Sequence, residues 1–243
     1  MQVLTNGGNT AQASVNINKG IGSLVFYSDL AFDALSNEKI NLKIQRNGKD
    51  DIEITPGTVS LKEFILACTY GDDAITSSSD FATVCVLELC EHGAINLREK
   101  DLIVLTLSQL DDTKTYTFDG IEEPTFSDDV YQYQRKSMAS EHENADFQTH
   151  GFDTLILTDH VSIEEVNYTF DNGMSCKYTL RELRALSQDN DPIAYVKNDG
   201  KVTASFANIL QLPLKGVDKV NIKKAQGAII NLFMRHDVDL RNL

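Results

Sequence analysis

The chain has 243 residues and a formal net charge of −14. Its length allows one large or two small domains, since about 100 to 200 residues per domain is typical. Its acidity argues against wrapping of duplex nucleic acid, because phosphate binding needs concentrated Lys and Arg. Division at residue 125 gives 9 − 19 = −10 for the first half and 13 − 17 = −4 for the second, so the acidity is spread over the chain.

Residues 1–12 are rich in Asn, Gly, Thr and Gln, and they predict a flexible N-terminal arm. They lack the basic segment and apolar core of a secretory signal, so we expect a protein made and used without export. No apolar run in the sequence approaches the ~20 residues of a membrane-spanning helix.

Short stretches of alternating apolar and polar residues follow, and a period of two predicts β-strands with one buried face. In the first half the predicted strands are residues 13–19, 23–30, 40–45, 81–90, 101–107 and 114–119. In the second half they are residues 130–134, 152–158, 162–168, 193–197, 201–206, 217–223 and 227–234. Residues 140–146 are polar enough to predict an exposed loop, and Leu212-Pro213-Leu214 predicts a break between strands.

Two Asn-Gly pairs, Asn47-Gly48 and Asn172-Gly173, each end a strand-like segment. Asn and Gly tolerate the positive φ angles that tight hairpin turns need, so each pair predicts a β-hairpin turn. The two pairs lie 172 − 47 = 125 residues apart, which is about half of the chain.

A short predicted helix follows each turn. Ser60 with Glu63, and Thr179 with Glu182, fit the capping-box pattern of Ser or Thr followed three residues later by Glu. In such a box the hydroxyl accepts from the amide of the third helical residue, and the carboxylate accepts from the amide of the cap. The sequence therefore predicts that helices begin at Ser60 and Thr179.

The same order of turn and capped helix in each half predicts an internal duplication. The alternative is that two unrelated short helices occur by coincidence in an ordinary β protein. Duplication predicts domains at residues 13–124 and 125–243, joined at the acidic segment 121–125, where Pro124 interrupts strand pairing. Many short strands with one helix per half predict an all-β fold of antiparallel barrels or sandwiches.

Motifs of enzymatic chemistry are missing from the sequence. It lacks a glycine-rich nucleotide loop, a His-Glu-x-x-His helix, the Gly-x-Ser-x-Gly elbow of hydrolases and an EF-hand pattern. We therefore predict no catalytic residue, no enzymatic activity and no cofactor-binding residue.

Metal sites are judged from spacing. Cys85 and Cys90 lie five residues apart on a predicted strand and so point to opposite faces, which argues against a cluster with His92. The acidic groups at residues 72–73, 111–112, 128–129 and 189–191 offer oxygen ligands for Ca²⁺, but such groups are more often solvated loop residues. We predict no metal site within one chain, and leave Ca²⁺ at subunit contacts as the open alternative.

The duplicated strand, turn and helix, together with the segment Phe152–Asn242, resemble the double jelly-roll major capsid proteins of icosahedral, membrane-containing bacteriophages. The likeness is to the corticovirus type of the adenovirus and tectivirus lineage, whose second barrel has a comparable strand, turn and amphipathic helix where this chain has residues 166–186. The resemblance implies two tandem eight-stranded jelly-roll barrels, each with a short α-helix. It also implies a homotrimer whose six barrels form a pseudo-hexagonal capsomer.

The resemblance further implies a structural virion protein that assembles in the host cytoplasm and tiles with itself into a capsid lattice. Its other partners would be further capsid proteins, such as a penton protein, and an internal membrane beneath the shell; sequence-specific binding of nucleic acid is not expected. The acidity departs from this pattern, because a shell over anionic lipid favours basic residues. The one dense positive cluster is Lys215, Lys219, Lys223 and Lys224.

The main alternative is a non-capsid two-domain β binding module, such as a spike or a carbohydrate-binding protein. The absence of Trp favours the capsid interpretation, because sugar-binding faces commonly use large aromatic platforms.

Overall fold

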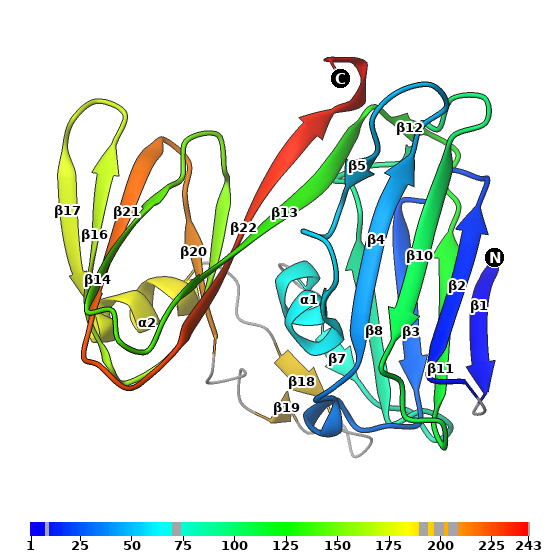
Figure 1. The fold of residues 1–243 in the computed structure, drawn as a ribbon, viewed down its shortest axis with the longest axis horizontal. Coiled ribbons are helices and arrows are strands. Elements are labelled where there is room, and N and C mark those ends of the chain that lie inside the picture. The colour runs from blue at the N-terminus through cyan, green and yellow to red at the C-terminus, as the bar shows by residue number, and fades with distance from the viewer. Residues whose placement is uncertain (8–9, 70–73, 190–193, 197–201, 204–208, 243) are drawn as a thin grey trace. The chain divides into compact units, whose positions relative to one another are not determined.

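A computed structural model of the chain describes residues 1–7, 10–69, 74–189, 194–196, 202–203 and 209–242. The chain divides into two compact units (Figure 1). Unit 1 comprises Met1–Gln132, Ile193–Ala204 and Asp237–Leu243, and unit 2 comprises Tyr133–Pro192 and Ser205–His236. Neither α-helix of the described residues is long and apolar enough to cross a membrane.

Unit 1 consists mostly of short antiparallel strands. They are β1 (Gln2–Gly7), β2 (Gln12–Ile17), β3 (Ser23–Ser28), β4 (Lys39–Gln45), β5 (Ile52–Glu53), β6 (Val59–Ser60), β7 (Ala74–Thr76), β8 (Thr83–Glu88), β9 (Ala94–Ile95), β10 (Leu102–Ser108), β11 (Thr115–Ile121), β12 (Phe126–Ser127), β18 (Ala194–Val196) and β19 (Val202–Thr203). Its helices are η1 (Phe32–Ala34), α1 (Leu61–Cys68) and η2 (Leu240–Asn242). One sheet has the order β1-β11-β3-β8-β7-β18-β19, a second has the order β2-β10-β4-β5 with β6 also paired to β4, and β12 pairs with β9 in a small third sheet.

Unit 2 has the remaining elements. They are β13 (Asp129–Met138), β14 (Asn144–Gln148), β15 (Thr154–Thr158), β16 (Ile163–Phe170), β17 (Ser175–Thr179), α2 (Leu180–Asp189), β20 (Ile209–Pro213), β21 (Val217–Lys224) and β22 (Ile230–Asp239). They form two sheets with the orders β13-β22-β15-β20 and β14-β21-β16-β17. The first residues of β13 and the last residues of β22 belong to unit 1.

The two units repeat one strand order. In unit 1 the principal strands in chain order are β1, β2, β3, β4, β5, β8, β10 and β11, and in unit 2 they are β13 to β17 and β20 to β22. In both units the first, last, third and sixth strands form one sheet, and the second, seventh, fourth and fifth form the other. The α-helix follows the fifth strand in both units. This repetition supports the predicted duplication over the alternative of two unrelated helices.

The alternating sequences of the strands fill the core of each unit. In unit 1, β10 pairs with β4 in the register that aligns Leu105 with Leu42 and Ile103 with Ile44, and all four side chains are buried. In unit 2 the core contains Leu155, Leu157, Leu183, Leu210, Leu212, Val220, Ile222, Leu232 and Met234. Burial of each large apolar side chain stabilises the fold by about 1.5 to 3 kcal/mol relative to its exposure.

Three local predictions were wrong. Residues 2–7 form β1, which pairs antiparallel with β11 and buries Leu4, rather than a flexible arm. The predicted loop at residues 140–146 contains the start of β14, whose polar residues pair with β21. Leu212 and Pro213 lie within β20 rather than in a break, because Pro213 is the last residue of that strand and Leu212 is in the core. Polar composition is compatible with a strand at the edge of a sheet, and β1 and β14 are both edge strands.

The division into units differs from the predicted domains at residues 13–124 and 125–243. The chain passes from unit 1 to unit 2 after Gln132, within β13, and residues 237–243 return to unit 1. The predicted strands at residues 193–197 and 201–206 extend beyond the described residues, which there are limited to β18 and β19.

Candidate functional site

The predicted turn of unit 1 joins two paired strands. Asn47 and Gly48 follow β4, which pairs antiparallel with β5 through Lys43 and Glu53. Gly48 has a φ of 74°, and a Cβ atom there would meet nothing within 4 Å, so the backbone angle alone accounts for glycine. The amide of Asn47 donates to Asp101 Oδ1 at 2.9 Å.

The predicted turn of unit 2 joins β16 to β17, which also pair antiparallel. Gly173 has a φ of 80°, and its amide donates to the carbonyl oxygen of Phe170 at 2.9 Å. Asn172 Oδ1 accepts from the amide of Met174 at 2.9 Å, which closes the turn locally.

Both predicted caps lie at helix starts. Ser60 is the N-cap of α1, and its Oγ accepts from the amide of Glu63 at 3.4 Å. Thr179 precedes α2, and its Oγ1 accepts from the amide of Glu182 at 3.4 Å. Glu182 Oε2 accepts from the Thr179 amide at 2.7 Å and from the Thr179 hydroxyl at 2.8 Å. These two donors lower the pKa of Glu182, with the backbone bond the larger cause.

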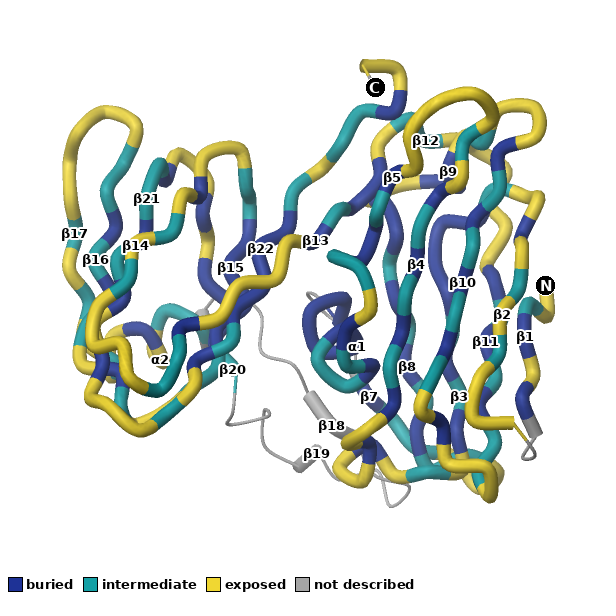
Figure 2. The backbone as a smooth tube through the Cα atoms, in the orientation of Figure 1, coloured by how far each residue is buried: buried dark blue, intermediate teal, exposed yellow. Residues whose placement is uncertain are grey.

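The two helices differ in how much of their surface is covered (Figure 2). In α1 the buried residues are Leu61, Phe64, Ile65, Leu66, Ala67 and Cys68. In α2 Leu183 is buried in the core, whereas Arg181, Arg184 and Ala185 are exposed. Arg184 binds Asp159 through two nitrogens, with Nε to Oδ2 at 2.8 Å and Nη2 to Oδ1 at 2.9 Å. Helix α1 is therefore part of a core, and α2 has a free side.

Equivalent sheet faces also differ. On the outer face of β13-β22-β15-β20, Ile156 aligns with Gln211 and Phe233, and these residues are 5%, 2% and 3% exposed. The equivalent row on β1-β11-β3-β8 is Asp119, Val25 and Val86, aligned in the same way, and all three are only half-buried.

The next row on this face of unit 1 is Thr117, Tyr27 and Val84, which are also half-buried. The rings of Tyr27 and Phe81 lie 5.2 Å apart, centroid to centroid. Burial, and secondarily the charge of Asp119, raise the pKa of Tyr27. We call Val25, Tyr27, Val84, Val86, Thr117 and Asp119 the outer face of unit 1. It is an apolar surface with an acidic residue on it.

Two of the four lysines in the sequence cluster form ion pairs, and a third is buried. Lys219 Nζ lies 3.5 Å from Asp146 Oδ2, and Lys223 Nζ lies 2.9 Å from Glu164 Oε2. Lys224 is 1% exposed, and its Nζ donates to the carbonyl oxygens of Ser140 at 3.2 Å and Ala225 at 3.4 Å. Lys224 therefore holds two loops together, and the cluster does not form a continuous positive surface.

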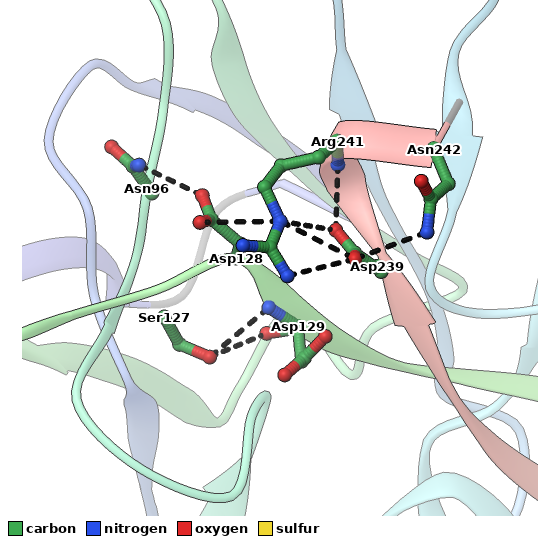
Figure 3. Close-up of polar contacts among 7 residues, drawn as sticks. All are labelled: Asn96, Ser127, Asp128, Asp129, Asp239, Arg241 and Asn242. Carbon is green, nitrogen blue, oxygen red and sulfur yellow. Dashed lines mark hydrogen bonds and ion pairs between the residues drawn. The ribbon is translucent and has the colours of Figure 1, made fainter.

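A polar cluster fastens the C-terminal residues to the rest of unit 1 (Figure 3). Arg241 donates to Asp239, with Nε to Oδ1 at 3.0 Å and Nη2 to Oδ2 at 2.9 Å, and its Nε lies 3.6 Å from Asp128 Oδ2. The Arg241 side-chain bonds lower the pKa of Asp239. The Leu240 amide donates to the Asp128 carbonyl at 2.7 Å, and Asn96 Nδ2 donates to Asp128 Oδ1 at 2.8 Å. These bonds hold residues 239–242 against β12 and β13.

A buried polar network in unit 1 was not predicted. Tyr116 donates its hydroxyl proton to Glu38 Oε1 at 3.0 Å, and Glu38 Oε2 accepts from the amides of Ser36 and Asn37 at 2.9 and 3.1 Å. Burial is the largest cause that raises the pKa of Tyr116. The carboxylate is satisfied by local donors, so the network is structural rather than catalytic.

Metal-binding and nucleophilic residues are dispersed. Among the residues described, no three His, Cys, Asp or Glu side chains are grouped to hold an ion. The acidic residues 72–73 and the last two of 189–191 lie outside the described residues. Cys90 is buried, and desolvation, with nearby carboxylates such as Glu123, raises the pKa of its thiol to about 12. It is therefore a thiol rather than a nucleophilic thiolate at neutral pH.

Comparison with known proteins identifies the fold. No protein-family description and no curated protein matches the sequence. The crystal structure of the STIV MCP is similar over 98% of this chain and 94% of that chain, with a TM-score of 0.53 and 10% identity. The major capsid protein P2 of bacteriophage PM2 is similar over 96% of this chain and 94% of that chain, with a TM-score of 0.51 and 10% identity. The structure of Sulfolobus Turreted Icosahedral Virus gives a TM-score of 0.57 at 8% identity, over 97% of this chain and 88% of that chain.

These similarities extend over nearly the whole chain, and together with the repeated strand order they define the fold as a double jelly roll. The chain thus shares its fold with major capsid proteins, as its sequence resemblance predicted.

Proposed function

We propose that this chain is the structural major capsid protein of an icosahedral bacteriophage, without enzymatic activity, and that it forms homotrimeric pseudo-hexagonal capsomers. The observation that carries the proposal is the repetition of one jelly-roll strand order in two units of a single chain. Two similar barrels per protomer place six around a three-fold axis, so one gene product can tile a facet with nearly hexagonal tiles. Closed cyclic symmetry then favours a trimer of defined size.

The partners follow from this role. The chain would bind itself within the trimer and then in the capsid lattice, with a penton protein at the five-fold positions and an internal membrane beneath the shell. Its site of action is the virion, after assembly in the host cytoplasm. To contact anionic lipid, Lys219 and Lys223 would have to exchange their carboxylate partners, whereas Lys224 is buried.

Multi-angle light scattering of the purified chain tests the proposal. We expect a mass of about three times the 27.0 kDa chain mass at micromolar concentration. A monomer at that concentration contradicts the capsomer role and favours the alternative of a two-domain β binding module. Electron microscopy of material concentrated further should then show no hexagonal tiles.

A further inference from the structure

We infer that the outer face of unit 1 is the contact between protomers, and that helix α2 of a second copy of this chain covers it. This inference rests on the proposed function and names the surfaces that would form the trimer.

The first argument is the unequal burial of equivalent surfaces. The outer face of β13-β22-β15-β20 is closed, with Ile156, Gln211 and Phe233 at most 5% exposed. Its counterpart in unit 1 leaves Val25 and Val86 half-buried. Because the two units share one strand order, the open copy of this face presents half-buried apolar residues that a second copy of the chain can cover.

The helices give the complementary half of this pattern. Helix α1 of unit 1 is covered on nearly every side, whereas α2 of unit 2 exposes Arg181, Arg184 and Ala185. Of these two equivalent sheets, one has a closed outer face and the other an open one, and of the two α-helices one is closed and the other open. The open face belongs to unit 1 and the open helix to unit 2. In a closed ring of three copies, the open face of each protomer meets the open helix of the next, as heterologous contacts in cyclic oligomers require.

Charge favours the same pairing. The outer face of unit 1 carries Asp119, and Glu88 follows Val86 on the same side of β8. The exposed residues of α2 include Arg181, Glu182 and Arg184, and Arg184 is already ion-paired with Asp159, so Arg181 is the cation of α2 that can approach Asp119. Unit 1 as a whole has 12 − 24 = −12 charges, and unit 2 has 10 − 12 = −2. Contact between unit 1 and unit 2 is thus much less repulsive than contact between two copies of unit 1, and this disfavours a two-fold dimer through this face.

The outer face can be tested with a matched pair of substitutions. Val86→Asp places a charge on the face, directly beside Val25. Val104→Asp is the control, because Val104 is also half-buried but lies on the outer face of the other sheet, between Asn16 and Lys43. Light scattering over a dilution series should show Val86→Asp as a monomer at micromolar concentration. The dissociation midpoint, which is the protein concentration at which the trimer is half dissociated, should rise by more than about 100-fold, as for a charge buried at an interface. Val104→Asp should remain a trimer.

The helix side is tested by Arg181→Glu, with Lys177→Glu as control. Lys177 is exposed on β17 and its Nζ lies 3.1 Å from Glu165 Oε1, so the control reverses a charge close to α2 but off the helix. Arg181→Glu should raise the dissociation midpoint about tenfold, more at low salt, whereas Lys177→Glu should leave it near that of the original chain. Because Arg181 is exposed, this variant should keep its far-ultraviolet circular dichroism even where Val86→Asp does not fold.

The possible outcomes separate the two proposals. If the unaltered chain is a monomer, the proposed capsomer itself is wrong. If the unaltered chain is a trimer and folded Val86→Asp is also a trimer, the capsomer stands and the outer face of unit 1 is not its contact. A trimeric Arg181→Glu variant with an unchanged midpoint overturns the assignment of α2 as the partner surface.

Discussion

Helices α1 and α2 occupy the same place in two copies of one fold, yet α1 is mostly buried and α2 is exposed on one side. Aligned on their caps, Ser60 and Thr179, they share Leu, a basic residue, Glu and a large apolar residue in the first turn. The next aligned pair is Ile65, which is fully buried, and Arg184, which is exposed and bound to Asp159. The residue types of the first turn are thus determined by the cap and the local chain, whereas those of the following turn depend on whether the helix is buried or exposed there.

The largest expected effect tests this divergence. Ile65→Ala should lower the free energy of unfolding by about 2 to 5 kcal/mol, because it leaves a cavity in a fully buried site. Arg184→Ala should cost less than Ile65→Ala, since the Arg184 side chain is 46% exposed, but it should still destabilise the chain because it removes the ion pair with Asp159, whose side chain is only 7% exposed. Urea denaturation of both variants measures the two costs. Equal losses would mean that the coverage of α1 contributes no more to stability than the ion pair of α2.

The caps test the similarity of the two helices. Ser60→Ala and Thr179→Ala should each lower the free energy of unfolding by about 0.5 to 2 kcal/mol, because each removes the acceptor for an N-terminal helix amide. Thermal unfolding followed by circular dichroism provides the measurement. If neither variant melts at a lower temperature than the unaltered chain, the capping boxes do not define these helices.

The smallest effect is a pH dependence confined to α2. The donors of Thr179 hold the pKa of Glu182 below the ordinary glutamate value of 4.5 in the folded chain. The unfolded chain therefore binds this proton at higher pH than the folded chain does. The stabilisation from the ionised Glu182 carboxylate is therefore complete above pH 4.5, and it is lost as the pH falls from there through the lower pKa of the folded chain. Melting temperatures of Glu182→Gln should fall less steeply with acidification than those of the unaltered chain, and parallel curves would contradict the assigned bond.

Much of the architecture could be predicted from local sequence, because alternation, Asn-Gly turns and capping boxes act within a few residues. The strands around Leu42 and Leu105, and the turns at Gly48 and Gly173, are of this kind. What escaped prediction depends on distant neighbours. β1 is polar enough to resemble an arm, and only its pairing with β11 makes it a strand. Likewise, a Cβ atom at Gly22 would lie 2.2 Å from the carbonyl oxygen of Gly93, an approach that no local pattern reveals.

The candidate site was less predictable than the fold. The cap and turn residues could be named, but the open face around Val25 and Val86 could not, because half-buried valines alternate like any others. Its meaning depends on comparison with Ile156 and Phe233 in the other unit, and this requires the strand order of both.

The fastening of residues 239–242 to Asp128 also constrains biosynthesis. A ribosome must add all of unit 2 after Gln132 before the residues that complete unit 1 are made. Residues 1–132 of unit 1 therefore emerge before the C-terminal residues that bind Asp128, and unit 2 is translated in between. The two units cannot then fold as fully independent domains in the order of their synthesis. In the proposed capsomer, a subunit that meets its partners before residues 239–242 are made would lack the ion pairs of Arg241 with Asp128 and Asp239, so these late ion pairs would delay assembly.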